Sequence, residues 1–127
     1  MGLEIVEHTV GDIAVLTLKG RIILDYDESP LRTAVDTLVQ QGRLKIVLDL
    51  KDVNYIDSAG LGILVSKYIS VNRRGGNLKL LHLTPRTSHI LEITKLNRVF
   101  ECFESEDDAI RSFEEPRSPY SAGVVHS

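Results

Sequence analysis

The chain has 127 residues, of which 43% are hydrophobic and 26% charged, and 15 basic against 18 acidic residues leave a formal net charge of −3. A single cysteine excludes an intrachain disulfide and a multi-thiolate metal site, and it indicates a reducing, cytoplasmic setting. The acidic balance argues against direct nucleic-acid binding, and the sequence contains neither a run of roughly 18 apolar residues, as a membrane helix needs, nor a signal peptide.

A β-hairpin and a helix are predicted first. Ile5–Val10 and Ile13–Lys19 are rich in β-branched side chains, and Gly11-Asp12 between them suits a two-residue turn. Ser29-Pro30 then signals a helix start, because Ser can cap the free N–H groups and Pro fits the first turn. Apolar residues recur at helical spacing over Leu31–Val39.

The middle of the chain alternates strand and helix. Leu44–Leu50 is apolar on both faces, as expected of a central strand covered by other layers. Apolar residues at helical spacing over Leu61–Ile69 predict a second helix, which Gly75-Gly76 ends. Arg73-Arg74 is expected to complement the dipole at the end of this helix. Leu78–Leu83 reads as the next strand.

The last elements are short. Thr84-Pro85 opens a short helix, and Val99–Phe103 is predicted to be the last strand, with Cys102 as a small core residue. Ser105 with Asp108 resembles a capping box before a final helix.

This order predicts an α/β fold. A mixed, largely parallel sheet of about five strands, with the first strand antiparallel at an edge, is expected to pack with about four helices. The folded domain is expected to span residues 1–113. Residues 114–127, with two prolines and three serines, are expected to form a flexible tail.

The segment Tyr55–Gly62 (Tyr-Ile-Asp-Ser-Ala-Gly-Leu-Gly) is the most unusual in the sequence. It lies between the central strand and the second helix, and the carboxyl ends of strands form the usual functional edge of an open α/β sheet. Gly60 and Gly62 cost about 1 kcal/mol each relative to Ala in a helix, which is tolerated where the backbone must closely approach something else.

Ser58 has two interpretations from spacing alone. It is either only the N-cap of the helix, with the glycines relieving packing against the sheet, or a phosphorylation site in the first turn. Phosphate would add roughly −1.5 to −2 charge. Because a helix N-terminus accommodates anions, we expect phosphate to change the surface beside Asp57 rather than to melt the helix.

Catalysis by Ser58 is much less favoured than either interpretation. A nucleophile elbow requires Gly where this chain has Ile56, and no Gly-Lys-Ser/Thr string follows a glycine loop. The four histidines are scattered and are expected to have structural roles: His8, His82, His89 and His126. No metal site and no cofactor is expected. A small hydrolase or transferase that uses Ser58 therefore ranks below the other interpretations.

The residues around Ser58 resemble those of a known family. Asp57–Gly62, preceded by Ile46–Leu50 and followed by Gly75–Leu78, is similar to the STAS domain, and more narrowly to the bacterial anti-sigma factor antagonists of the sporulation and general-stress type. Thr94–Phe100 also resembles the family's segment before the last strand. The likeness covers nearly the whole predicted domain.

The resemblance implies partner switching by a chain that is not an enzyme. The unphosphorylated antagonist binds an anti-sigma factor that is also a serine kinase, which releases a sigma factor. Phosphorylation of Ser58 breaks the complex, and a serine phosphatase resets it. A weak homodimer is also compatible with the resemblance. The alternative is a STAS scaffold or accessory subunit of a stress-signalling or lipid-transport complex, without a phosphoswitch.

The resemblance also implies a partner-binding surface. Its predicted residues are Arg21, Asp25, Asp57, Ser58, Ala59, Gly60, Leu61 and Gly62. One departure concerns the loop after the second strand, where the family often has Gly-x-Leu-Asp. This chain has Ile23 in the place of that Asp, and Asp25 or Asp27 is the candidate substitute.

Overall fold

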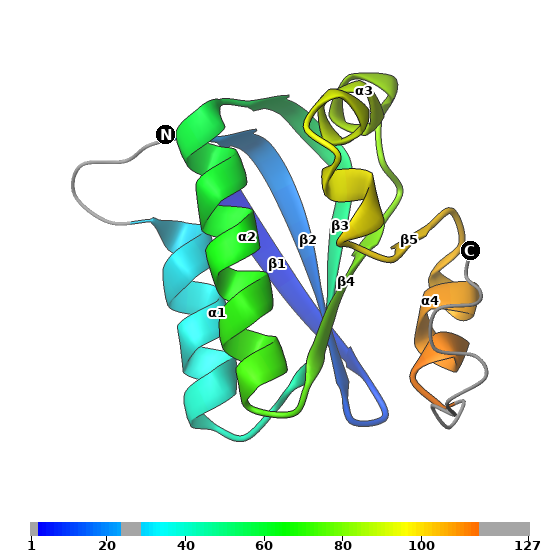
Figure 1. The fold of residues 1–127 in the computed structure, drawn as a ribbon. Helices are drawn as coiled ribbons and strands as arrows, with labels where there is room; N and C mark the ends of the chain where they lie inside the picture. Colours follow the sequence, from blue (N-terminus) through cyan, green and yellow to red (C-terminus); the bar gives the residue numbers. More distant parts are fainter. Residues whose placement is uncertain (1–2, 24–28, 115–127) are drawn as a thin grey trace.

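The computed structural model describes residues 3–23 and 29–114. Within these ranges the elements in chain order are β1 (Leu3–Val10), β2 (Ile13–Ile22), α1 (Pro30–Gln40), β3 (Lys45–Ile56), α2 (Ser58–Arg73), β4 (Asn77–Leu81), α3 (Pro85–Ile93), the 3₁₀ helix η1 (Leu96–Arg98), β5 (Cys102–Phe103) and α4 (Glu106–Ser112) (Figure 1). The predicted alternation of strands and helices is confirmed, with η1 added before β5.

The strands form one mixed sheet in the order β1-β2-β3-β4-β5. β1 is antiparallel to β2, and the three other pairings are parallel. The hairpin closes at the pair Val10–Ile13, and Gly11 takes a positive φ of 61° that the tight turn requires. The prediction of a largely parallel sheet with an antiparallel edge strand is therefore confirmed.

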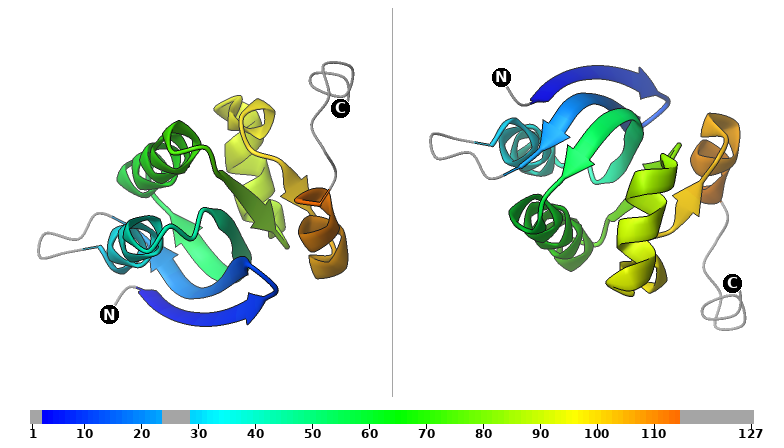
Figure 2. Two further views of the ribbon diagram at one scale, coloured as in Figure 1. Left: turned by 90° about the horizontal axis from the view of Figure 1, so that it is seen from below. Right: turned by 90° about the horizontal axis from the view of Figure 1, so that it is seen from above.

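Helices cover both faces of the sheet. α1 and α2 lie side by side on one face and α4 lies on the other (Figure 2). The larger core lies under α1 and α2, where Leu16, Leu48 and Leu80 from three neighbouring strands are at most 1% exposed. A smaller cluster under α4 contains Val47 and Ala109. β3 is thus covered on both faces, as its apolar sequence predicts.

Three of the predicted helix starts are confirmed by side-chain caps. Ser29 accepts the N–H of Arg32 at 3.2 Å, and Thr84 accepts that of Thr87 at 3.1 Å. Ser105 caps α4 in the same way. No helix within the described part of the chain is long and apolar enough to cross a membrane.

Every predicted strand differs from the observed one at an end: β1 begins at Leu3 rather than Ile5, β2 ends at Ile22 rather than Lys19, and β4 ends at Leu81 rather than Leu83. The two other strands differ more. β3 continues to Ile56 rather than ending at Leu50, because its pairing with β2 persists while only one of its faces stays buried. The last strand was predicted to be Val99–Phe103, but only Cys102–Phe103 pairs with β4. η1 and the loop after it occupy the earlier positions, and Val99 is 39% exposed.

Cys102 is an exposed residue of this edge strand and not the core residue that the sequence predicts. Its sulfur is partly buried, 3.7 Å from the carbonyl oxygen of Phe100. Burial of the sulfur, together with the negative charge of Glu101, raises the pKa of the thiol to about 11. The thiol is therefore protonated at neutral pH.

Candidate functional site

The candidate site lies where β2 and β3 end and α2 begins. Ile22 and Ile56 pair at the ends of the two strands, and the N–H of Asp57 donates to the carbonyl oxygen of Ile22 at 3.2 Å. Asp57 has φ −97° and ψ 179°, so its backbone is still extended. The turn from β3 into α2 is thus made by one residue that remains hydrogen-bonded to β2.

Asp57, and not Ser58, is the N-cap of α2. Its Oδ1 accepts the N–H of Gly60 at 2.6 Å. A carboxylate is well suited to this position because it satisfies a free N–H group and carries a charge that the helix dipole favours. The interpretation of Ser58 as only an N-cap is therefore wrong.

Ser58 is the first residue of α2 and is exposed. Among the residues that the structure describes, none forms a hydrogen bond with its hydroxyl. The capping bond from Asp57 does not involve this hydroxyl. Ser58 can therefore be modified without removal of a contact that starts the helix.

Gly60 and Gly62 differ in what surrounds them. Gly60 is buried, and a Cβ added there would lie 2.7 Å from the carbonyl carbon of Ile22 and closer still to its oxygen. The close approach expected for this glycine is therefore confirmed, and it occurs inside the chain. Gly62 is exposed, and a Cβ added there would meet no described residue within 4 Å. The described part of the fold thus gives no reason for glycine at position 62.

Most of the predicted partner-binding residues lie at this edge of the sheet. Arg21 is exposed and pairs across β2 and β3 with Tyr55, which is 42% exposed and lies two residues before Asp57. Ala59 and Leu61 are half-buried in the first turn of α2. Asp25 and Asp27 fall outside the described residues, as do residues 115–127 of the predicted tail.

Two histidines have structural partners, as the sequence predicts. His82 Nδ1 lies 3.0 Å from Oδ1 of Asp49, whose residue is 2% exposed, and His8 Nε2 lies 3.0 Å from Glu106. Neither hydrogen bond involves Ser58. Within residues 3–23 and 29–114, no three His, Cys, Asp or Glu side chains are grouped as a metal site would require.

Two features of the structure were not predicted. The contact of Asp49 with His82 joins positions 33 residues apart, and His82 adopts a positive φ of 58° that no local motif predicts. The second feature is a groove along α2, between that helix and Leu96 of η1. A signal for the groove was present, because residues 58–72 contain a single charged residue, Lys67.

Comparisons with known proteins agree with this geometry. A model of the STAS domain family matches residues 4–109. The chain is 29% identical over 117 residues to the anti-sigma F factor antagonist of Paenibacillus polymyxa, covering 90% of this chain and 97% of that protein. It is 32% identical over 106 residues to the anti-sigma-B factor antagonist of Bacillus subtilis, covering 84% and 94%. An anti-sigma factor antagonist from Mycobacterium paratuberculosis shares the fold with a TM-score of 0.76 at 23% identity, over 90% of this chain and 96% of that one.

Proposed function

Because the chain belongs to the STAS domain family and, within it, to the anti-sigma factor antagonists, we propose that it binds an anti-sigma factor that is also a serine kinase. This binding releases a sigma factor, and phosphorylation of Ser58 ends the binding. A serine phosphatase restores the binding form, and the cycle takes place in the cytoplasm. The family is one of regulators rather than enzymes, so Ser58 is a substrate of the partner and not a nucleophile.

The main support for this proposal is the exposure of Ser58 and its independence from the helix cap. The residue is exposed at the first position of α2, and the cap of the helix comes from the neighbouring Asp57. A kinase can therefore reach the hydroxyl while the capping hydrogen bond stays in place. Phosphate at a helix N-terminus meets the positive end of the dipole, so the modified chain is expected to keep its fold.

Charge supplies the switch. Phosphate adds roughly −1.5 to −2 charge beside the Asp57 carboxylate. The net charge of −3 then becomes about −5, with the change concentrated on the surface that faces the partner. A penalty of about 3 kcal/mol from repulsion and lost contact would weaken binding more than 100-fold. That is enough to separate two binding states.

The partner-binding surface is proposed to centre on the first turn of α2. Ser58, Leu61 and Gly62 are at least partly accessible there, and Arg21 extends the surface along the end of β2. Gly60 is buried and contributes to this surface indirectly, since its lack of a Cβ lets the first turn of α2 approach the carbonyl of Ile22. Asp25 stays part of the proposal as a residue of the loop after β2.

Phosphorylation and binding can be measured with the serine-kinase anti-sigma factors encoded by the same genome. Incubation with kinase and ATP, followed by mass spectrometry of peptides, is expected to place one phosphate on Ser58. Ser58→Ala is expected to prevent this and to bind in the presence of ATP, whereas Ser58→Asp is expected to bind at least about 100-fold more weakly.

Ser66→Ala is the matched control, since Ser66 is an exposed serine two turns further along the same helix. It is expected to be phosphorylated at Ser58 like the wild type. Equal binding by Ser58→Ala and Ser58→Asp would refute the switch. Phosphate only at other residues would instead favour the scaffold alternative.

A further inference from the structure

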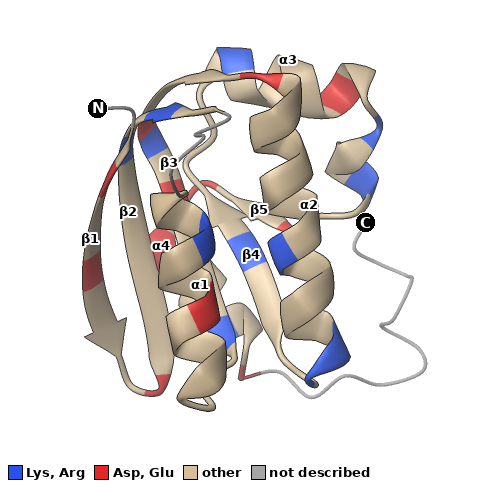
Figure 3. Ribbon diagram, turned by 90° about the vertical axis from the view of Figure 1, so that its left-hand side faces the viewer, with Lys and Arg blue, Asp and Glu red and all other residues tan. Residues whose placement is uncertain are grey.

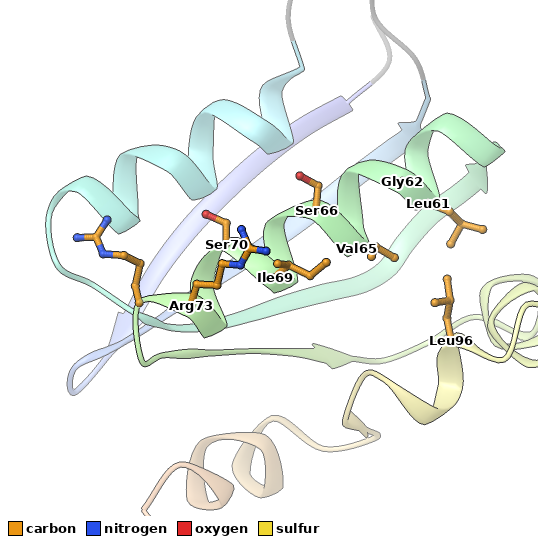
Figure 4. A pocket seen from close by; sticks show the side chains of 9 residues that line it. Leu61, Gly62, Val65, Ser66, Ile69, Ser70, Arg73 and Leu96 are labelled. Carbon is orange, nitrogen blue, oxygen red and sulfur yellow. The ribbon is translucent and has the colours of Figure 1, made fainter.

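A groove of about 890 Å³ runs along α2, from the turn after Ser58 to the end of the helix (Figure 4). Leu61, Val65 and Ile69 follow one another along the helix at intervals of four residues, and Leu96 of η1 points toward Leu61. Ile69 is 42% exposed. Single exposed apolar side chains are ordinary, but an aligned row in a groove is typical of an interaction surface.

A second row in the groove is made of small residues. Gly62, Ser66 and Ser70 also follow at intervals of four, so they lie along one ridge of the helix. Small side chains on such a ridge let another backbone come close. Glycine is less favourable than Ala in a helix, and nothing in the described chain occupies the space of a Cβ at position 62. Packing among the described residues therefore does not require glycine there.

The outward face of α2 is also nearly uncharged. Its Lys67 is 7% exposed, and the ammonium group is 2.7 Å from the Asp36 carboxylate of α1. In Figure 3 the ribbon of α2 has one blue stretch midway along the helix and another at its C-terminal end, and is otherwise tan over most of its length. A solvent-facing helix surface normally carries charged residues. The exposed face of α2 is therefore unusually poor in charge for a helix surface that faces solvent.

Two arginines limit what can occupy the groove. Arg73 and Arg74 line its end and are exposed, and none of the described residues that line the groove is acidic. Neither arginine forms an ion pair with another described residue. Guanidinium groups bind carboxylates through paired, charge-assisted hydrogen bonds. An occupant that complements this groove is apolar along α2 and acidic at the end of the helix.

We propose that the groove binds an amphipathic helix of the anti-sigma factor, with small and apolar residues against α2 and a carboxylate on Arg73 and Arg74. This inference rests on the proposed function, which supplies the partner. From Leu61 to Arg73 the groove is about 18 Å long, which is the rise of a helix of about 12 residues. The other end of the groove begins one turn from Ser58. Phosphate on Ser58 would therefore lie next to the bound helix and weaken its binding.

The test uses the purified serine-kinase anti-sigma factor of the same genome that binds the wild-type chain, with affinity measured by surface plasmon resonance. The double variant Arg73→Glu/Arg74→Glu is expected to bind about 10- to 100-fold more weakly, the range for loss of charge-assisted hydrogen bonds. The neutral variant Arg73→Ala/Arg74→Ala is expected to show a weaker dependence of affinity on salt. Circular dichroism and thermal unfolding check that each variant is folded.

The matched control is Lys19→Glu/Arg111→Glu, which makes the same change of net charge at exposed residues outside the groove. It is expected to bind within about twofold of the wild type. An equal loss in the control would overturn the assignment of the groove, because the effect would then be long-range repulsion.

The two proposals fail in different ways. If Ser58→Asp abolishes binding while Arg73→Glu/Arg74→Glu binds like the wild type, the function stands and the groove is refuted. If no serine-kinase anti-sigma factor of the genome binds the wild type, the proposed function fails and the groove loses its partner with it. If Ser58→Asp binds as well as the wild type, the switch is refuted, and the arginine variants still decide whether the partner occupies the groove.

Discussion

The two glycines of α2 are expected to respond differently to substitution by alanine: Gly62→Ala stabilises the chain and Gly60→Ala destabilises it. Gly60 and Gly62 lie two positions apart in the same helix, so the added methyl group and its effect on helix propensity are matched. At Gly62 the new Cβ enters open space. Alanine there is expected to stabilise the chain by up to about 1 kcal/mol.

At Gly60 the same methyl group would overlap the carbonyl of Ile22, a backbone group of a buried strand end. Overpacking of this kind costs about 1–3 kcal/mol, and a rigid backbone places it at the upper limit. Relief requires α2 to move from β2, which stretches the bond from the Asp57 N–H to the Ile22 carbonyl and loses about 1 kcal/mol more. The gain in helix propensity offsets about 1 kcal/mol. The net expectation is a loss of about 3 kcal/mol.

Urea unfolding followed by circular dichroism measures both variants against the wild type. A loss of about 3 kcal/mol is a large part of the stability of a small domain and lowers the Tm by roughly 10 °C. A Gly60→Ala variant within about 0.5 kcal/mol of the wild type would refute the close approach between α2 and β2. Gly62→Ala is also expected to bind the anti-sigma factor less tightly although it is more stable. Unchanged binding by Gly62→Ala would contradict the close packing of a partner helix against Gly62.

Two other predictions concern single side chains. Asp57→Ala is expected to lower the free energy of unfolding by about 1 kcal/mol, because it removes the cap of α2. Ser58→Ala is expected to change the free energy of unfolding by less than about 0.5 kcal/mol. Both values are measured by urea unfolding, and a larger loss for Ser58→Ala than for Asp57→Ala would contradict the assignment of the cap. With a thiol pKa of about 11, Cys102 is thiolate in about one molecule per thousand at pH 8, against about one in four for an unfolded chain. Alkylation by iodoacetamide, followed by mass spectrometry, is therefore expected to be slow in the folded chain and to accelerate up to pH 11, and fast labelling at pH 8 would refute the raised pKa.

The order of the elements was predictable because it depends on local patterns. Ser29, Thr84 and Ser105 each cap a helix where the sequence places one, and the hairpin turns at Gly11. Such signals act within a few residues, so neighbouring sequence contains them. The strand ends were less predictable. β3 extends to Ile56 because a backbone ladder with β2 continues after the apolar pattern has changed.

The candidate site was predictable in position and not in detail. The string around Ser58 indicates the start of a helix after a central strand, and α2 begins there. Spacing alone could not assign the cap, because Asp57 and Ser58 are both good capping residues. Which of them is the cap depends on whether the backbone of Asp57 is extended or helical, and the sequence does not show this. The groove was missed because Leu96 comes from η1, far along the chain from α2.

By itself, the sequence determines that this chain forms an α/β domain with a helix starting at the Asp-Ser-x-Gly string, since periodicity, caps and turns are local properties. Only the tertiary structure separates the two glycines. The carbonyl of Ile22 lies against Gly60, whereas Gly62 is exposed and no described residue lies within 4 Å of a Cβ built there. The difference arises because residues 38 positions apart meet where β2 ends, and long-range packing decides which face of a helix is buried and which stays open to a partner.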